Sequence, residues 1–339
     1  MTTPEESQAS GSWDEVSDLY YRRGMTDGLP IVPPTAERVA VMVAASGREP
    51  GAVLDKLPPL WASATVEKVA VNAVMAGCLP EYMSVVLAAV EVVAEEQFNL
   101  YAVQATGSPV SPGFVVNGPV AGALGINAGY NALGQGHRAN ATIGRALRLV
   151  LMNIGGGRPG DTDRATQGWP GKFTLCFAEN EAESPWDPLH VELGYDKQSS
   201  TITGFGACGT TAVTDPRSQS AEGILLSLAN HMTPNLAGGG QPVVVIAPEN
   251  AHVIARDGFT KDDVKLFLWE HARLPVTAFS QDAQIAAIKV RRESGRSPYS
   301  YATVAAQPGD ILVVVAGGAG YHSTIIPTIM ARATTRVIR

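Results

Sequence analysis

Residues 114–119 read Phe-Val-Val-Asn-Gly-Pro, and residues 243–248 read Val-Val-Val-Ile-Ala-Pro. Each stretch is a short β-branched or aromatic run, followed by a small residue and a proline that can begin a helix. Such strand-to-helix units are typical of α/β proteins, in which helices cover the faces of a sheet. The sequence therefore predicts a layered α/β fold with mainly parallel sheets and flanking helices. The similarity of these two segments suggests that two lobes arose by duplication, and chance similarity is the alternative.

The chain has 339 residues, more than one hydrophobic core usually supports. We predict an N-terminal arm at 1–26, a first α/β lobe at 27–218 and a second α/β lobe at 219–339. Further strands are expected at 174–178, 200–204 and 311–316, and helices at 139–153 and 220–231.

Composition excludes several classes of protein. Lys and Arg number 25 against 32 Asp and Glu, a net charge of −7, so no nucleic-acid partner is expected. No apolar run reaches the ~18 residues of a membrane span, so no membrane partner is expected. The three cysteines show no paired spacing, which favours a cytoplasmic location. No nucleotide-binding or metal-ligand spacing is present, so no cofactor and no metal are predicted.

A glycine-rich loop at 134–137 runs directly into a predicted helix. Free backbone N–H groups gather at such a helix start, and arginines nearby would add positive charge. We expect an anion site made by Gly136, Arg138, Asn140 and Arg145. The alternative is a plain glycine turn whose arginines pair with local carboxylates.

An acidic loop at 176–192 follows a predicted strand, where ligands often lie in α/β sheets. Crowded carboxylates can raise one pKa, as general acid–base catalysis at neutral pH requires. Glu179 and Glu181 are therefore candidate catalytic residues, with Asn180 orienting the substrate. The alternative is a solvated loop anchored by Trp186.

A glycine turn at 317–320 follows the last strong strand. It lets the backbone approach a ligand and brings two polar residues to the sheet edge. His322 is the preferred histidine for proton transfer, and Ser323 is a candidate substrate contact; turn structure alone is the alternative. His190 and Glu192 are expected on one side of a strand, without a spacing that completes a metal site.

Two cysteines are candidate nucleophiles. Cys78 precedes a predicted helix, whose dipole would lower its pKa, and Cys208 lies in a turn beside hydroxyl groups. A buried, unreactive thiol is the commoner use of cysteine.

Several stretches together resemble a group of largely uncharacterised bacterial proteins, the UGSC-type (seleno)protein family. The resemblance covers most of the chain and implies a shared architecture, but no substrate or catalytic residue. The UGSC tetrad itself is absent, and Gly77-Cys78 does not match it, which argues against selenol or thiol redox chemistry. The stretches are DGLPIVPPT (27–35), EKVAVNAVMAGCLPEYM (67–83), GHRANATIGRALRLVLMNIGG (136–156), CFAENEAESPWDPLHVE (176–192) and VVAGGAGYHS (314–323).

The leading hypothesis is a cytosolic enzyme that acts on a small anionic organic substrate by acid–base chemistry of the lyase or hydratase kind. The alternatives are a thiol-dependent redox or covalent-catalysis protein, and a non-catalytic binding protein. At least two of the loops 134–140, 179–190 and 317–323 should line one cleft, with Arg138 or Arg145 facing Glu179, Asn180 or His322. Aromatic residues in the arm, such as Trp13 and Tyr21, favour a homodimer or larger homo-oligomer.

Overall fold

The computed structural model describes residues 12–233, 240–293 and 300–339. No helix in those residues is long and apolar enough to cross a membrane. The helices are α1 (Trp13–Arg22), α2 (Ala36–Ser46), α3 (Val66–Ala76), α4 (Met83–Ala94), α5 (Leu100–Gln104), α6 (Pro119–Ala123), α7 (Arg138–Asn153), α8 (Leu189–Glu192), α9 (Ala221–Met232), α10 (Pro248–Arg256), α11 (Lys261–His271) and α12 (Gln281–Glu293). The strands are β1 (Val53–Leu57), β2 (Ala62–Thr65), β3 (Ser111–Asn117), β4 (Cys176–Ala178), β5 (Thr201–Ala207), β6 (Thr211–Thr214), β7 (Val243–Ile246), β8 (Arg273–Pro275), β9 (Tyr301–Thr303), β10 (Leu312–Val315), β11 (His322–Ile326) and β12 (Thr334–Val337).

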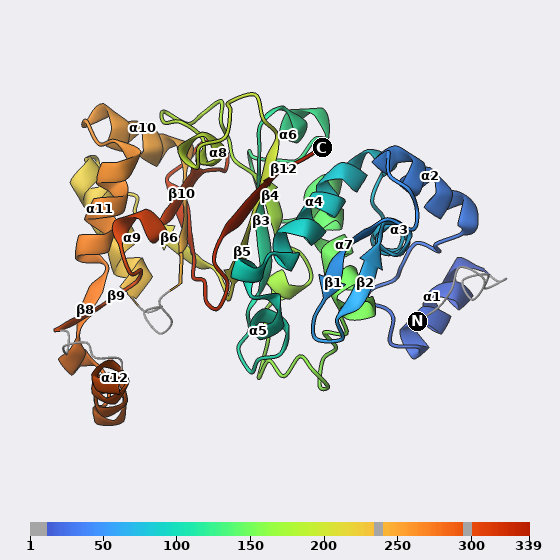
Figure 1. Ribbon diagram of the computed structural model, residues 1–339. Coiled ribbons are helices and arrows are strands. Elements are labelled where there is room, and N and C mark those ends of the chain that lie inside the picture. Colours follow the sequence, from blue (N-terminus) through green and yellow to red (C-terminus); the bar gives the residue numbers. More distant parts are fainter. Residues whose placement is uncertain (1–11, 234–239, 294–299) are drawn as a thin grey trace.

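Two four-stranded sheets pack face to face, and helices cover the outer face of each (Figure 1). The first sheet has the order β12-β5-β3-β4, and the second has the order β10-β7-β11-β6. Side chains alternate along each strand, so Val115 and Phe177 of the first sheet meet Val245 and Val314 of the second in one apolar layer. Phe114 points the other way, into the core beneath α3, α4 and α7. The predicted α/β layering with flanking helices is confirmed.

The sheets are mixed, so the prediction of mainly parallel sheets is wrong. In the first sheet β3 pairs with β4 in parallel, whereas β5 and β12 are antiparallel to their neighbours. The second sheet repeats this arrangement, with β7 and β10 parallel and β11 and β6 antiparallel. The prediction failed because β6, β11 and β12 each follow a short connection. A short connection has no room for a crossover helix, which a parallel strand needs and an antiparallel strand does not.

The fourth strand of each sheet comes from the other half of the chain. β6 follows β5 directly but pairs with β11 of the second sheet, and β12 follows β11 but pairs with β5 of the first. Where the two connections pass each other, Ala207 forms an isolated bridge with Thr328. The predicted lobes at 27–218 and 219–339 therefore exchange one strand each, and the division of the chain into these lobes stays a prediction.

The two echoing segments occupy equivalent positions. They are β3 and β7, the central members of the two parallel pairs, and each leads into a helix with proline at its start, Pro119 in α6 and Pro248 in α10. The backbone N–H after each partner strand bonds back in the same way, from Glu179 to Val116 and from Ala316 to Ile246. A shared origin predicts this match, and duplication itself stays a prediction.

The long helix α7 positions the candidate site. It lies against α3 on the outer side of the first sheet, and its apolar residues, among them Ile143 and Leu147, enter the core. An extended, proline-rich segment at 27–35 crosses one flank of α7, because its three prolines cannot occupy a helix interior. The polar side of α7 is thereby placed between this segment and the loop at 157–173.

Candidate functional site

A cavity of about 850 Å³ opens beside α7. Its walls come from the segment 24–28, the C-terminal half of α7 and the loop 157–173. Met152, Trp169 and Phe173 supply apolar surface, whereas Arg148 and Lys172 supply positive charge. Apolar walls with a few charged groups are usual for small-molecule sites of this size.

Arg148 is the half-buried arginine of this cavity, which Arg158 also lines from an exposed position. Its Nε donates a hydrogen bond to the backbone oxygen of Lys172 at 2.7 Å. Among the described residues its two terminal nitrogens have no hydrogen-bond or ion-pair partner. Burial lowers the pKa of Arg148, and the charges of Asp163 and Asp27 raise it again. A guanidinium stays protonated in proteins, so a charged fork faces the cavity without a protein anion bonded to it.

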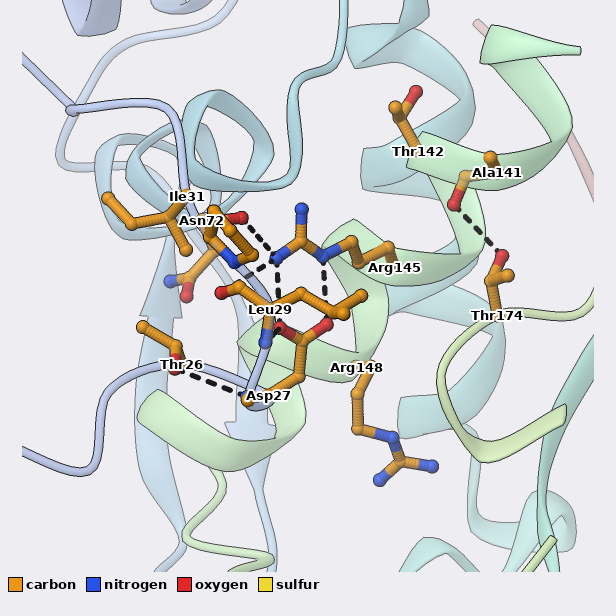
Figure 2. Close-up of polar contacts among 12 residues, drawn as sticks. Thr26, Asp27, Leu29, Ile31, Asn72, Ala141, Thr142, Arg145, Arg148 and Thr174 are labelled. Carbon is orange, nitrogen blue, oxygen red and sulfur yellow. Dashed lines mark hydrogen bonds and ion pairs between the residues drawn. The ribbon is translucent and has the colours of Figure 1, made fainter. Parts of the chain in front are cut away.

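Arg145, one turn earlier on α7, has a different environment. Its Nε and one terminal nitrogen bond the two oxygens of Asp27 at 2.8 and 2.9 Å, and the terminal nitrogen also donates to the backbone oxygen of Pro30. Figure 2 shows this pair, with the guanidinium of Arg148 pointing away from it. Arg145 therefore fastens the extended segment to α7 and already has a carboxylate partner.

Lys172 and Asp163 form a second ion pair at the cavity, with Nζ and Oδ2 2.6 Å apart. Burial lowers the pKa of Lys172, the bond and charge of Asp163 raise it, and nearby Arg148 lowers it again. A lysine whose pKa is lowered by burial gives up its proton more readily than a solvent-exposed lysine does. The cavity thus combines an unpaired anion-binding group with a group able to transfer protons.

The indole of Trp169 completes one wall of the cavity. Its ring lies where a Cβ on Gly171 would collide, so only glycine fits at that position. The indole Nε1 is buried and has no hydrogen-bond partner among the described residues. A buried donor without a partner costs free energy.

The residues predicted to bind an anion are separated. Arg138 donates from Nε to the backbone oxygen of Gly77 and lines another cavity, beside Cys78. Asn140 is buried, and its amide holds the loop 127–132 through Asn127. Gly136 has φ +112°, so the turn itself requires glycine.

The acidic loop forms a buried polar cluster. Glu179 is nearly inaccessible, and its Oε2 accepts hydrogen bonds from Nδ2 of Asn117 and the backbone N–H of Leu189, both at 2.7 Å. Glu181 accepts from the same amide at 3.0 Å and from the N–H of Gly118 at 2.7 Å. Both glutamates thus fix the turn that follows β3, and the solvated-loop alternative is wrong for Glu179.

Two lysines of α11 reach this cluster from the second half of the chain. Lys261 lies 3.7 Å from Glu179 and 3.3 Å from Glu192, and Lys265 pairs with Glu192. Burial lowers the pKa of Lys261, with Glu179 opposing the shift, and burial lowers the pKa of Lys265 to about 8. His190 is fully buried in α8, so the expected strand for His190 and Glu192 is wrong. A proline-started helical turn replaces it.

The third predicted loop contacts the acidic loop and the loop at 127–132, through one hydrogen bond to each. Gly317 donates its N–H to Ala128, and its oxygen accepts from the side chain of Asn180. Ser323 is buried, and its Oγ accepts from the N–H of Ala247. His322 lies 3.1 Å from the hydroxyl of Thr214. The predicted facing of these residues by Arg138 or Arg145 is wrong, because those arginines bond Gly77 and Asp27.

Both candidate thiols have raised pKa values, although a lowered pKa was predicted for Cys78. Burial raises the pKa of Cys78 to about 12, and its Sγ donates to the backbone oxygen of Thr142. Burial likewise raises the pKa of Cys208 to about 11, and its Sγ donates to Pro327. The expected lowering by a helix start fails for Cys78 because desolvation outweighs any dipole.

Sequence reasoning missed Arg148, Asp163, Trp169 and Lys172. A signal for the first was present, because Arg145 and Arg148 are spaced three apart and share one side of a helix. Nothing local marked the others, since they come from an irregular loop that folds back on α7. Among the described residues, no group of three His, Cys, Asp or Glu side chains could hold a metal ion.

No protein family, curated protein or solved structure matches this chain. The resemblance to the UGSC-type group therefore stays a prediction.

Proposed function

We propose that the protein binds a small anionic organic molecule in the cavity beside α7 and acts on it by acid–base chemistry of the lyase or hydratase kind. The observation that carries the proposal is the guanidinium of Arg148, which lines this cavity without a partner anion among the described residues. A carboxylate or phosphate fits its two terminal nitrogens.

Lys172 supplies the proton transfer. Its neutral amine takes the proton from the carbon next to a substrate carboxylate, while Arg148 stabilises the negative charge that develops on that carboxylate. The leaving hydroxide departs with the electron pair of the C–O bond and receives the proton from Lys172 as water. Asp163 holds Nζ in place, because the 2.6 Å contact is an ion pair when Lys172 is protonated and a hydrogen bond from Nζ to Oδ2 when the amine is neutral. The predicted roles of Glu179, Glu181 and His322 are not needed for this scheme.

The proposal places the protein in the cytoplasm, where its three free cysteines stay reduced. It also favours the acid–base reading over the thiol alternative, because Cys78 and Cys208 have raised pKa values. A non-catalytic binding protein would use the same cavity, so turnover has to be tested separately from binding.

We also propose a homo-oligomer. Val16 and Tyr20 of α1 are buried on their own chain, which leaves Trp13 and Tyr21 of the same helix exposed for a partner. Light scattering on the full chain should give a mass above 35.5 kDa, and Tyr21→Ser should shift the mass towards that of one chain. A monomer at all concentrations contradicts this part.

Calorimetric titration of the full chain with short carboxylates and inorganic phosphate tests the binding step. We expect Arg148→Gln to weaken carboxylate binding about tenfold or more, since one charge-assisted contact is lost. Arg256→Gln, which removes an exposed arginine of α10, is the matched control and should bind as the wild type does. Equal affinity of Arg148→Gln and the wild type would contradict the proposal.

Exchange of substrate hydrogen with deuterated water tests the catalytic step. A panel of 3-hydroxycarboxylates should show deuterium next to the carboxylate with the wild type. Lys172→Arg keeps the positive charge but stays protonated, so it should bind the same compounds without exchange. Binding without exchange by the wild type would leave the non-catalytic alternative.

A further inference from the structure

A second, smaller cavity adjoins the cavity of Arg148. It has a volume of about 240 Å³ and is lined by Arg23, Lys68 and Arg158 together with the amides of Asn72 and Asn153. Arg158 lines both cavities. The smaller cavity is too small for a typical organic ligand but has room for one charged group.

The wall between the two cavities is the chain at 23–26. Arg23 and Met25 face the smaller cavity, whereas Gly24 and Thr26 face the larger one. At the C-terminal end of α7 the same division occurs, with Met152 on the larger side and Asn153 on the smaller. The two cavities are therefore separated only by the backbone of residues 23–26, and Arg158 lines both of them.

The smaller cavity carries positive charge without compensation. No carboxylate is among its lining residues, and within the described parts of the chain Arg23, Lys68 and Arg158 form no ion pair. Lys68 donates one hydrogen bond, to the backbone oxygen of Ser63. Three like charges around one small space repel each other, and an anion between them would remove that cost.

The floor of the smaller cavity is fixed. Nδ2 of Asn153 donates to Oδ1 of Asn72 at 2.7 Å and to the backbone oxygen of Met25 at 3.0 Å. Asn72 in turn donates to the backbone oxygen of Lys68 at 2.9 Å. These bonds tie α3, α7 and the dividing wall together, so the floor of the smaller cavity is preformed, with the exposed Arg23 and Arg158 and the half-buried Lys68 around it.

We propose that the ligand carries two anionic groups, one bound by Arg148 in the larger cavity and one by Arg23 and Lys68 in the smaller. Arg158 lines both cavities and would contact the part of the ligand that joins the two groups. The inference rests on the proposed function and specifies its substrate class: an organic dianion, with a carboxylate or phosphate at each end. A monoanion would fill the larger cavity and leave the three cations unpaired.

Titration with dicarboxylates of increasing length tests this class. The probes are malonate, glutarate, pimelate and azelate, each compared with the monocarboxylate of the same carbon number. Wild-type protein should bind one length of dicarboxylate about tenfold more tightly than its monocarboxylate, because only that length reaches both cavities. Arg23→Gln combined with Lys68→Gln should abolish this advantage and leave monocarboxylate binding unchanged.

Lys56→Gln removes an exposed lysine of β1 and is the matched control. Urea midpoints of all variants establish that each is folded. Monocarboxylate binding that depends on Arg148, with no advantage of any dicarboxylate, would overturn the dianion and keep the proposed function. Dicarboxylate binding that depends on Lys68 but not on Arg148 would overturn both.

Discussion

At the scale of the residue, two arginines of one helix show why spacing alone does not assign a role. Arg145 and Arg148 lie on neighbouring turns of α7, yet one bonds Asp27 and the other faces a cavity. The sequence singled out Arg145, because it stands in the glycine-rich stretch. Which arginine is free depends on Asp27, more than a hundred residues earlier, and no local pattern contains that information.

We predict that Asp27→Ala lowers the free energy of unfolding by about 3 kcal/mol, because Arg145 loses a largely buried partner. The extended segment after residue 27 also loses its attachment to α7. Urea denaturation measures the change, with Asp55→Ala, an exposed position in β1, as control. A loss no larger than that of the control would show that the pair contributes little to stability.

The cysteines should be unreactive at neutral pH. With pKa values raised to about 12 for Cys78 and about 11 for Cys208, almost no thiolate exists at pH 7, and the thiolate is the reacting form. Iodoacetamide labelling of the native protein should therefore be much slower than that of the urea-unfolded chain. Labelling should accelerate as the pH rises, first at Cys208. Rapid labelling of native Cys78 at pH 7 would restore the thiol alternative.

At the scale of the element, the strand-to-helix turns could be read from the sequence, because proline and glycine impose strong local constraints. Helix α7 and strands β3, β7 and β10 lie where their patterns predicted. The strands β6, β11 and β12 were not predicted, since a few residues of mixed polarity carry no clear period. Their pairing is decided by distant partners.

The turn after β3 gives a prediction at this scale. Gly118 has φ +82° and ψ −173°, a region almost restricted to glycine, and a Cβ there would collide with the backbone oxygen of Ser199. Gly118→Ala should therefore destabilise the protein by about 2–3 kcal/mol. Gly122→Ala, in α6 with open space around it, should be neutral or slightly stabilising. Equal thermal midpoints of the two variants would contradict the argument.

At the scale of the whole molecule, the sequence predicted the layers but not the exchange of strands. The layers follow from the alternation of apolar residues along each strand, which is a local pattern. The exchange of strands depends on which sheet edge β6 and β12 pair with, and no local pattern determines that. The candidate site was hidden for the same reason: α7, the segment 24–28 and the loop 157–173 meet only in the folded chain.

We predict that the halves 1–218 and 219–339 do not fold when made separately. Each would lack the strand that completes its sheet, β12 for the first half and β6 for the second. Mixed together, they should recover the circular dichroism and cooperative unfolding of the intact chain. Cooperative unfolding of either half alone would show instead that the predicted lobes are independent domains.

The exchanged strands also set the order in which the protein can mature on the ribosome. β5 ends at Ala207, but its neighbour β12 begins only at Thr334, so this edge of the first sheet stays open until the residues of β12 have been translated. Domains generally fold as they emerge, N-terminal part first. Here the nascent first half has an unpaired strand edge until β12 is made. During this period a chaperone would protect it from aggregation.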